Sequence, residues 1–250
     1  LMRLSTAHAT ANREAIAYQS AAGPSALAKA TGRVPDWKRV GEDVIKKRTN
    51  ETDARLCRAI GSDGSLANHI PVVHSIEAVD DGALHDVLMQ DLAGGMTRPC
   101  AMLIVMGCRT VVPADFEEEG SAPSADLLEK LRALDASAPT AEEEAAGGVS
   151  RRRYLQFLDS SSSTASLGFR IDAAKTVVDG ELATLPLPEG VSLETLHDEA
   201  NVQTAIGTFL QDDYTLCKAV LGKLQALTTA LERSAFYSKH VLLRSTLLMV

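Results

Sequence analysis

Residues 151–154 place three arginines and a tyrosine side by side (Arg-Arg-Arg-Tyr), and Lys46 and Lys47 form a second basic group nearer the N-terminus. The planar guanidinium of arginine presents paired N–H donors that match phosphate oxygens, and lysine adds a compact positive charge. These residues could therefore bind a phosphorylated small molecule. Alternatively, both groups are solvated surface charge, and the arginine run also fits a weak nuclear-import signal.

The composition limits the classes of partner. The formal net charge of -8 at pH 7 argues against a general nucleic-acid binder, because phosphate backbones are held by clustered Lys and Arg. This charge still leaves room for a locally basic pocket. No apolar run approaches the ~20 residues needed to cross a bilayer. The sequence therefore predicts neither a nucleic-acid partner nor a membrane span.

Several other kinds of site lack their motifs. The six histidines have no metal-ligand spacing, and the sequence itself implies no bound metal. The serine run at 160–163 has no Gly-x-Ser-x-Gly motif, and no Gly-x-x-x-x-Gly-Lys-Ser/Thr phosphate loop is present. The cysteines have no Cys-x-x-Cys spacing, which predicts reduced thiols and a cytoplasmic or nuclear location.

Hydrophobic patterning predicts the elements that position the first basic group. Residues 1–36 are rich in Ala, Ser, Thr and Gly, and we expect a poorly ordered N-terminal segment there. Residues 44–48 read as a short strand that carries Lys46, and residues 51–60 read as a helix. Two strand-like runs around the turn at 80–82 predict a hairpin. Together these elements would form a small α+β lobe.

The second half of the chain predicts a buried strand and several helices. Residues 99–107 read as a loop that leads into an apolar strand ending at its last glycine. Residues 126–134 place leucines on one helical face, and Thr140 with Glu143 forms a capping box that predicts a second helix. The last expected elements are a helix around 220–231 and a strand within 243–250.

Two motifs give this chain a resemblance to a known family. Residues 99–107 (Pro-Cys-Ala-Met-Leu-Ile-Val-Met-Gly) are similar to the Pro-x-x-x-Asp-x-Lys-x-Gly signature of the inositol polyphosphate kinases. Residues 163–172 (Ser-Thr-Ala-Ser-Leu-Gly-Phe-Arg-Ile-Asp) closely resemble that family's Ser-Thr-Ala-Thr-Leu-Gly-Phe-Arg-Ile-Glu segment. The Ala-Pro-Thr-x-Glu-Glu-Glu turn and the Arg-Tyr motif are most like the inositol trisphosphate 3-kinases.

The resemblance implies a bilobal α+β fold with a helical substrate-binding insert. Residues 37–92 would form the N-lobe with its hinge, and residues 93–250 the C-lobe, which includes the insert at 111–160. ATP, Mg²⁺ and an inositol phosphate are the ligands that it implies. Lys46, Gln90 and Asp91 match the family's ATP contacts, and Arg151, Arg153, Tyr154 and Lys175 match or lie near its inositol-phosphate contacts.

The chain departs from the family at the catalytic positions. Leu103 and Val105 stand where the signature has Asp and Lys, and neither can accept a proton or neutralise phosphate charge. Leu158 stands where the family has a substrate-binding arginine, and the sequence stops before the family's Ile-Asp-Phe segment. Because single catalytic groups contribute ~10²–10⁴ in rate, we expect impaired catalysis.

Three functions are therefore open. The first is an ATP-dependent inositol phosphate kinase, impaired in this chain. The second is a non-catalytic relative, a pseudokinase that binds inositol phosphates or a protein partner. The third is a fragment that does not fold stably, because a C-lobe that is incomplete at its C-terminus would leave the strand at 247–248 without a neighbour and expose an apolar edge.

Overall fold

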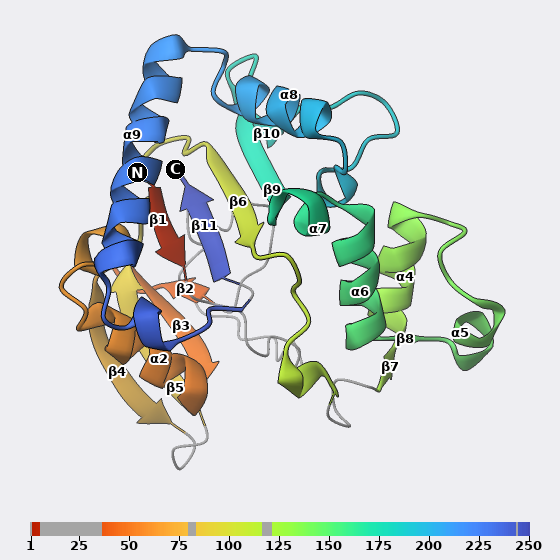
Figure 1. Ribbon diagram of the computed structural model, residues 1–250, viewed down its shortest axis with the longest axis horizontal. Coiled ribbons are helices and arrows are strands. Elements are labelled where there is room, and N and C mark those ends of the chain that lie inside the picture. Colours follow the sequence, from red (N-terminus) through yellow and green to blue (C-terminus); the bar gives the residue numbers. More distant parts are fainter. Residues whose placement is uncertain (1, 6–36, 80–83, 117–121, 244) are drawn as a thin grey trace.

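The computed structural model describes residues 2–5, 37–79, 84–116, 122–243 and 245–250. Two antiparallel sheets with surrounding helices form a mixed α+β fold (Figure 1), which confirms the predicted fold class. Apart from Met2–Ser5, the N-terminal segment expected to be poorly ordered lies outside the described residues. The predicted division of the chain at residues 92 and 93 stays a prediction.

The first sheet is built within residues 37–90 in the strand order β2-β3-β5-β4. Asn50 caps the helix that follows β3, because its side chain accepts a hydrogen bond from the amide of Asp53 at 2.8 Å. The predicted hairpin is present as an antiparallel pair of strands, although its turn lies outside the described residues. The elements are β2 (Trp37–Arg39), β3 (Val44–Asn50), α2 (Glu51–Gly61), η1 (Ala67–His69), β4 (Val73–Val79) and β5 (Leu84–Gln90).

The second sheet has the order β1-β11-β6-β9-β10 and joins the two ends of the chain. The expectation of an exposed edge at residues 247–248 is wrong, because β11 pairs with β6 on one side and with β1 on the other. Residues 2–5 accordingly form a strand within the segment expected to be poorly ordered. The strands are β1 (Met2–Ser5), β6 (Ala101–Met106), β9 (Phe169–Val178), β10 (Glu181–Thr184) and β11 (Ser245–Met249).

The two faces of this second sheet have different surroundings. On one face, Met102, Ile104 and Leu247 join the main apolar core beneath α8 (Glu199–Phe209) and α9 (Tyr214–Arg233). Because side chains alternate along a strand, the neighbouring positions of β6 point to the opposite face. Both faces of β6 are buried from Ala101 to Val105, which explains its continuous apolar sequence.

A polar contact ties the loop after α2 to the end of α9. The carboxylate of Asp63 accepts hydrogen bonds from the Ser234 hydroxyl at 2.8 Å and from the Phe236 amide at 3.0 Å. Donation by the Phe236 amide, followed by that of the Ser234 hydroxyl, lowers the pKa of Asp63 despite partial desolvation. Ile60 and Leu66 beside this contact belong to the same core as α9. The region around the first sheet is thereby attached to the second.

The helices of the predicted insert pack beside the second sheet (Figure 1). Leu127, Leu128 and Leu131 are buried on one face, as their spacing predicts. The capping box is confirmed. The Thr140 hydroxyl accepts a hydrogen bond from the Glu143 amide, and the Glu143 carboxylate accepts one from the Thr140 amide. The elements are η3 (Pro113–Phe116), β7 (Pro123–Ser124), α4 (Ala125–Leu134), α5 (Ala141–Ala146), β8 (Val149–Ser150), α6 (Arg151–Ser161) and α7 (Thr164–Leu167).

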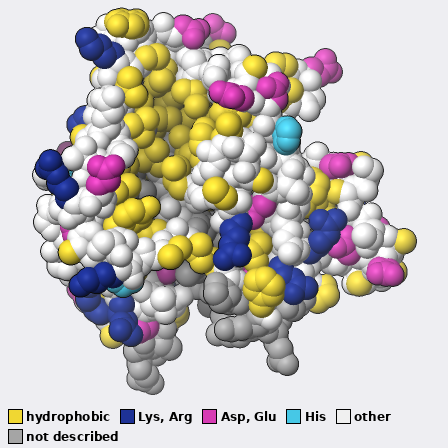
Figure 2. Space-filling model, viewed as in Figure 1, with side chains coloured by type: hydrophobic (Ala, Val, Ile, Leu, Met, Phe, Trp, Pro, Cys, Tyr) yellow, Lys and Arg dark blue, Asp and Glu magenta, His cyan; other side chains and the backbone are white. Residues whose placement is uncertain are grey.

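The first half of α9 leaves apolar side chains at the surface. Tyr214, Leu216 and Leu221 are exposed, and Figure 2 shows hydrophobic side chains gathered in the region beside this helix. Over the insert, on the right of the same view, Lys and Arg side chains lie next to Asp and Glu. Among the helices of the described ranges, none is long and apolar enough to cross a membrane.

Candidate functional site

The two apolar residues of the signature lie on one face of β6. Leu103 is only 7% exposed and packs in an apolar cluster with Leu92 and Leu248. Val105 is 2% exposed and stands opposite Thr246 in β11 and Arg170 in β9. The position that matches the family's aspartate is therefore filled by packed hydrocarbon, and the position that matches its lysine lies beside buried polar groups.

Gly107 ends the signature strand, as the sequence predicts. Its φ of 115° lies in a region that side chains disfavour. Its amide donates a hydrogen bond to the carbonyl of Gly168 at 2.7 Å, which joins the end of β6 to the start of β9. The frame of the signature is thus retained although its charged side chains are not.

Lys46 lies in a charge network rather than at a solvated strand end. Its Nζ is 2.9 Å from Oδ2 of Asp86, and Arg48 Nε is 2.9 Å from Oδ1 of the same carboxylate. Hydrogen bonding by Arg48, and then by Lys46, lowers the pKa of Asp86 despite its desolvation. Two cations thus share one carboxylate on this face of β3. Whether Lys46 contacts ATP stays a prediction.

Lys47 points to the opposite face of β3, toward α2. It is buried, and its Nζ lies 3.9 Å from Oδ2 of Asp53. Asp53 also accepts a hydrogen bond from the Thr49 hydroxyl at 2.9 Å. The sequence shows Lys47 only as a neighbour of Lys46, whereas the fold buries it against a carboxylate of α2. Because side chains alternate along a strand, Lys46 and Lys47 must point to opposite faces of β3. The local sequence does not show which of the two faces α2 covers.

The predicted hinge residues Gln90 and Asp91 lie at the end of β5. The Gln90 amide donates to the carbonyl of Val72 at 2.8 Å, and the Asp91 amide donates to that of Asp43 at 2.7 Å. The buried carboxylate of Asp91 accepts from the Ala93 amide at 3.0 Å. Its other oxygen lies 3.6 Å from Arg39 Nε. One carboxylate oxygen of Asp91 thus shapes the turn after β5, and the other is buried beside Arg39 without a hydrogen bond.

The predicted phosphate ligands of the insert lie at the start of α6, and both arginines are ion-paired. Arg151 Nε is 3.3 Å from Asp115, and Arg153 Nε is 3.1 Å from Glu143. Arg153 also donates to the carbonyl of Ala138 at 3.0 Å. These contacts attach α6 to η3 and α5, while 22% and 34% of the two side chains stay exposed. Both side chains are therefore partly exposed.

The other two predicted ligands have different surroundings. Tyr154 is half-buried and packs against the leucine cluster of the insert, so part of its ring stabilises that small core. Lys175 lies opposite Ala101 of β6, on the face that also carries Leu103. It is half-buried, and no ion pair joins it to another described residue. Lys175 is therefore a cation on the same sheet face as the signature positions.

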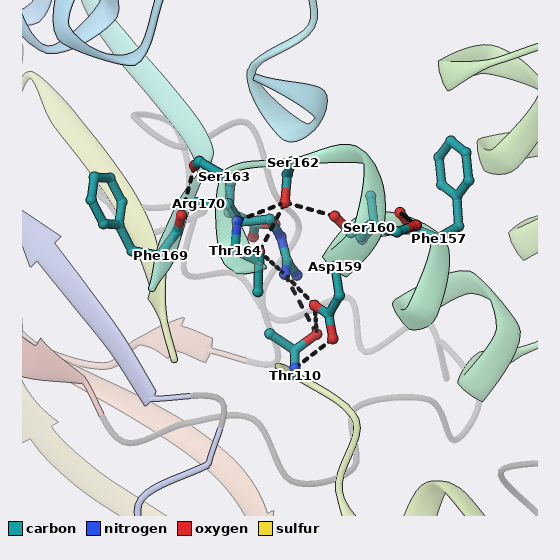
Figure 3. A network of polar contacts seen from close by, with 11 residues as sticks. Thr110, Phe157, Asp159, Ser160, Ser162, Ser163, Thr164, Phe169 and Arg170 are labelled. Carbon is teal, nitrogen blue, oxygen red and sulfur yellow. Dashed lines mark hydrogen bonds and ion pairs between the residues drawn. The ribbon is translucent and has the colours of Figure 1, made fainter. Parts of the chain in front are cut away.

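A buried polar network, which the sequence did not predict, joins α6 to the second sheet (Figure 3). Asp159 of α6 accepts hydrogen bonds from the amide of Thr110 at 2.7 Å and from its hydroxyl at 2.6 Å. Arg170 Nη1 donates to the same carboxylate at 3.2 Å, and its Nε lies 3.7 Å from Asp172. Thr164 accepts from Arg170 at 3.4 Å. These residues are hereafter the Asp159 network.

The sequence contained a signal for part of this network. Thr110 belongs to the Met-Gly-x-Arg-Thr run after the signature, and Arg170 belongs to the Gly-Phe-Arg-Ile-Asp run. The second run lies within the segment that resembles the family, and neither run by itself indicates a shared partner. Asp159 is a single carboxylate in a helix, and such a residue is usually solvated. Only the folded chain shows that it is the common partner.

The described residues do not by themselves fit a divalent metal. Within the ranges that the structure describes, no three His, Cys, Asp or Glu side chains gather into a group that could hold a metal ion. The signature positions contribute no ligand atoms, since Leu103 and Val105 carry none. The cationic groups Lys46, Lys47 and Lys175 instead suit anionic ligands.

Comparison with known proteins identifies the lineage. Residues 86–250, well over half of the chain, match the family described as "IPK: Inositol polyphosphate kinase". The chain belongs to the inositol polyphosphate kinase family. The family resemblance predicted from the two motifs is thereby confirmed.

Curated relatives agree with this assignment. The chain is 30% identical to inositol-trisphosphate 3-kinase A of Homo sapiens over 222 residues, which is 88% of this chain and 46% of that protein. It is 28% identical to an inositol-trisphosphate 3-kinase homolog of Caenorhabditis elegans over 212 residues, or 82% of this chain and 40% of that protein. The chain thus spans about half the length of these relatives or less.

A solved structure is also similar. It is described as the inositol phosphate multikinase Ipk2 in complex with ADP and Mn²⁺ from S. cerevisiae. The sequence identity is 18% and the TM-score is 0.46, with coverage of 76% of this chain and 68% of that one.

Proposed function

We propose that this chain is an inositol phosphate kinase by descent that binds an inositol phosphate but transfers phosphate poorly. The observation that carries the proposal is the packing of Leu103, which lies 7% exposed in an apolar cluster at the position of the family's aspartate. A hydroxyl group that attacks ATP needs a nearby proton acceptor or a charge that orients it. The hydrocarbon around Leu103 offers neither.

The neighbouring position adds to the same proposal. Val105 replaces the family's lysine, so the charge that would meet a phosphate from β6 is missing. The phosphoryl group carries negative charge while it is transferred, and positive side chains must neutralise that charge. Each lost group costs ~10²–10⁴ in rate. Leu158, at the position of a family arginine, is buried in α6 and supplies no replacement.

Binding of the inositol phosphate depends on cations that persist elsewhere. The side chains of Arg151 and Arg153 stay partly exposed at the start of α6. Lys175 adds a cation on the sheet face of the signature. A multiply phosphorylated ring is recognised chiefly by such groups, and an arginine fork contributes geometry as well as charge. We therefore assign these three residues to ligand binding, with Tyr154 supporting them.

The proposed nucleotide is ATP, with Mg²⁺ as the accompanying ion. Lys46 stays a candidate for its phosphates, and the burial of Lys47 against Asp53 makes Lys47 a second one. Backbone groups near Gln90 would contact the adenine. ATP bound with Mg²⁺ would supply the phosphoryl group. We place the protein in the cytoplasm or nucleus, as the spacing of its cysteines suggests.

The test is incubation of the chain with ATP, MgCl₂ and inositol trisphosphate, with ADP and inositol tetrakisphosphate both quantified. We expect formation of inositol tetrakisphosphate at least about 100-fold slower than typical kinase turnover of 1–100 per second. Turnover within that typical range would contradict impaired catalysis.

A thermal-shift titration with inositol trisphosphate, without nucleotide, tests binding separately. Ligand at about 100 times its Kd should stabilise the chain by ~2.7 kcal/mol. Replacing both Arg151 and Lys175 with Gln should remove most of this shift, whereas Arg132→Gln, on the exposed side of α4, should leave it unchanged. A wild-type chain with no shift at millimolar ligand would contradict the binding proposal. It would favour a pseudokinase that binds a protein partner.

A further inference from the structure

We infer that Asp159 is a positioning residue, which fixes the arginine-bearing helix α6 in register with the end of the signature strand. The contacts of Asp159 are observed in the structure, and only the choice of an inositol phosphate as the ligand rests on the proposed function. Asp159 lies at the opposite end of α6 from Arg151 and Arg153, so it acts on ligand binding only through the helix that carries them.

The carboxylate of Asp159 has three donors, two from the loop that follows β6 and one from β9. Thr110 donates from both its amide and its hydroxyl, and it stands three residues after Gly107, at the end of β6. Arg170 donates from β9. Thr110 is fully buried, and Arg170 is 3% exposed. Hydrogen bonds to an ionised carboxylate in such surroundings are stronger than neutral ones, and their geometry is closely fixed.

A second contact holds the other end of the same helix. Arg151 lies 3.3 Å from Asp115 of η3, and Asp115 in turn accepts a hydrogen bond from the Val112 amide at 2.8 Å. The segment from Thr110 to Asp115 is therefore attached to α6 at both ends of the helix. This segment is the direct continuation of the signature strand. The position of α6 is thus set by the residues that follow β6.

The geometry of a helix makes this attachment relevant to binding. An α-helix rises ~1.5 Å per residue, so the 11 residues of α6 span about 16 Å as a stiff body. Releasing one end lets the other end tilt. Charge-assisted hydrogen bonds from an arginine to a phosphate depend on short distances and on the paired geometry of the guanidinium, so a tilt of α6 would weaken them. Loss of Asp159 should therefore weaken phosphate binding at arginines that it does not touch.

Two variants of the full chain separate the contributions of Asp159. Asp159→Asn keeps an oxygen that can accept from the Thr110 amide but removes the charge that Arg170 contacts. Asp159→Ala removes both. The matched control is Glu144→Gln, which breaks the exposed ion pair with Arg132 inside the same insert and leaves the Asp159 network intact.

The first readout is amide hydrogen exchange, which needs no ligand. In Asp159→Ala, the Thr110 amide and the amides of α6 should exchange at least about tenfold faster than in the wild type, because the opened state becomes more accessible. Asp159→Asn should fall between the two. Glu144→Gln should match the wild type at these amides.

The second readout is the dissociation constant for inositol trisphosphate, measured by calorimetry. We expect it to rise about tenfold in Asp159→Ala and less in Asp159→Asn, with Glu144→Gln within about twofold of wild type. If Asp159→Ala does not fold, Asp159→Asn alone carries both comparisons.

The outcomes are distinguishable. Unchanged exchange at Thr110 and α6 overturns the inference whatever the ligand does. Faster exchange with unchanged affinity also overturns it, because the network would then only stabilise the fold. A wild-type chain that fails to bind inositol trisphosphate contradicts the proposed function instead. The exchange data then decide by themselves whether Asp159 holds α6 in place.

Discussion

The signature strand and the insert differ in which residues of the family pattern they keep. Pro99 and Gly107 of the signature persist on either side of β6, but Leu103 and Val105 stand in place of the family's Asp and Lys. In the insert, Arg151 and Arg153 persist at the start of α6, each paired with an acidic neighbour. The element expected to perform chemistry is therefore part of the core, while the element expected to bind phosphate keeps Arg151 and Arg153 but has Leu158 in place of a third arginine.

Under the proposed function, this difference assigns binding and transfer to separate parts of the fold. Transfer needs charged groups that project from a central strand, where an apolar replacement is readily accommodated by packing on both faces. Binding needs cations at the surface of a small helical unit with its own leucine core. The proposal therefore expects this chain to lose transfer and keep binding on one fold.

The largest effect should follow from Leu103→Asp, which restores the family's residue type in the strand. A carboxylate placed among Leu92 and Leu248 loses its hydration, and Lys175 on this sheet face is a diagonal neighbour across the strands and not a direct one. We therefore expect the free energy of unfolding to fall by about 3–5 kcal/mol. Urea denaturation at pH 7 measures this loss. Leu103→Met, which nearly conserves volume, should cost less than about 1.5 kcal/mol. A negligible loss in Leu103→Asp would mean that the side chain reaches solvent, and the contrast with the insert would disappear.

A smaller and more local effect is expected from Leu131→Ala in the insert. Leu131 is fully buried in the leucine cluster, and truncation should cost about 2–4 kcal/mol through lost contacts and a cavity. Hydrogen exchange should show loss of protection in α4 and α6, with protection in β6 retained. Leu134→Ala, at a half-buried position of the same helix, should cost less. Equal loss of protection in β6 would show that strand and insert are one cooperative unit.

The smallest effect should come from Asp63→Asn, which touches neither region. Loss of the charged acceptor for Ser234 and Phe236 should lower the free energy of unfolding by about 1–2 kcal/mol at pH 7. Hydrogen bonding lowers the pKa of Asp63 below its ordinary value of 3.8 in the folded state. Its contribution is therefore complete above pH 3.8 and is lost as the pH falls through the folded pKa.

Urea denaturation of wild type and Asp63→Asn at pH 7, 4 and 3 measures this dependence. The difference between the two proteins should shrink steadily toward the lowest pH. Glu189→Gln, at an exposed loop position, should match the wild type throughout. A difference that stays constant with pH would assign the effect to packing instead of charge.

Local sequence predicted much of the architecture. The leucine spacing of α4, the Thr140–Glu143 capping box and the glycine that ends β6 are properties of short stretches, and each appears in the structure. The family was likewise readable from two runs of residues. The roles of the individual ATP and inositol-phosphate ligands stay predictions.

What the sequence determined by itself is therefore the lineage, the order of elements and the loss of charge at Leu103 and Val105, because all three are written in neighbouring residues. Only the tertiary structure decided that β1 covers the edge of β11, that Lys47 is buried against α2, and that Asp159 joins α6 to Thr110 and Arg170. Each of these contacts joins segments whose pairing depends on how sheets and helices pack. The physical reason is that local propensity fixes periods and turns, whereas partners across the fold are selected by burial and by the need to satisfy buried polar groups.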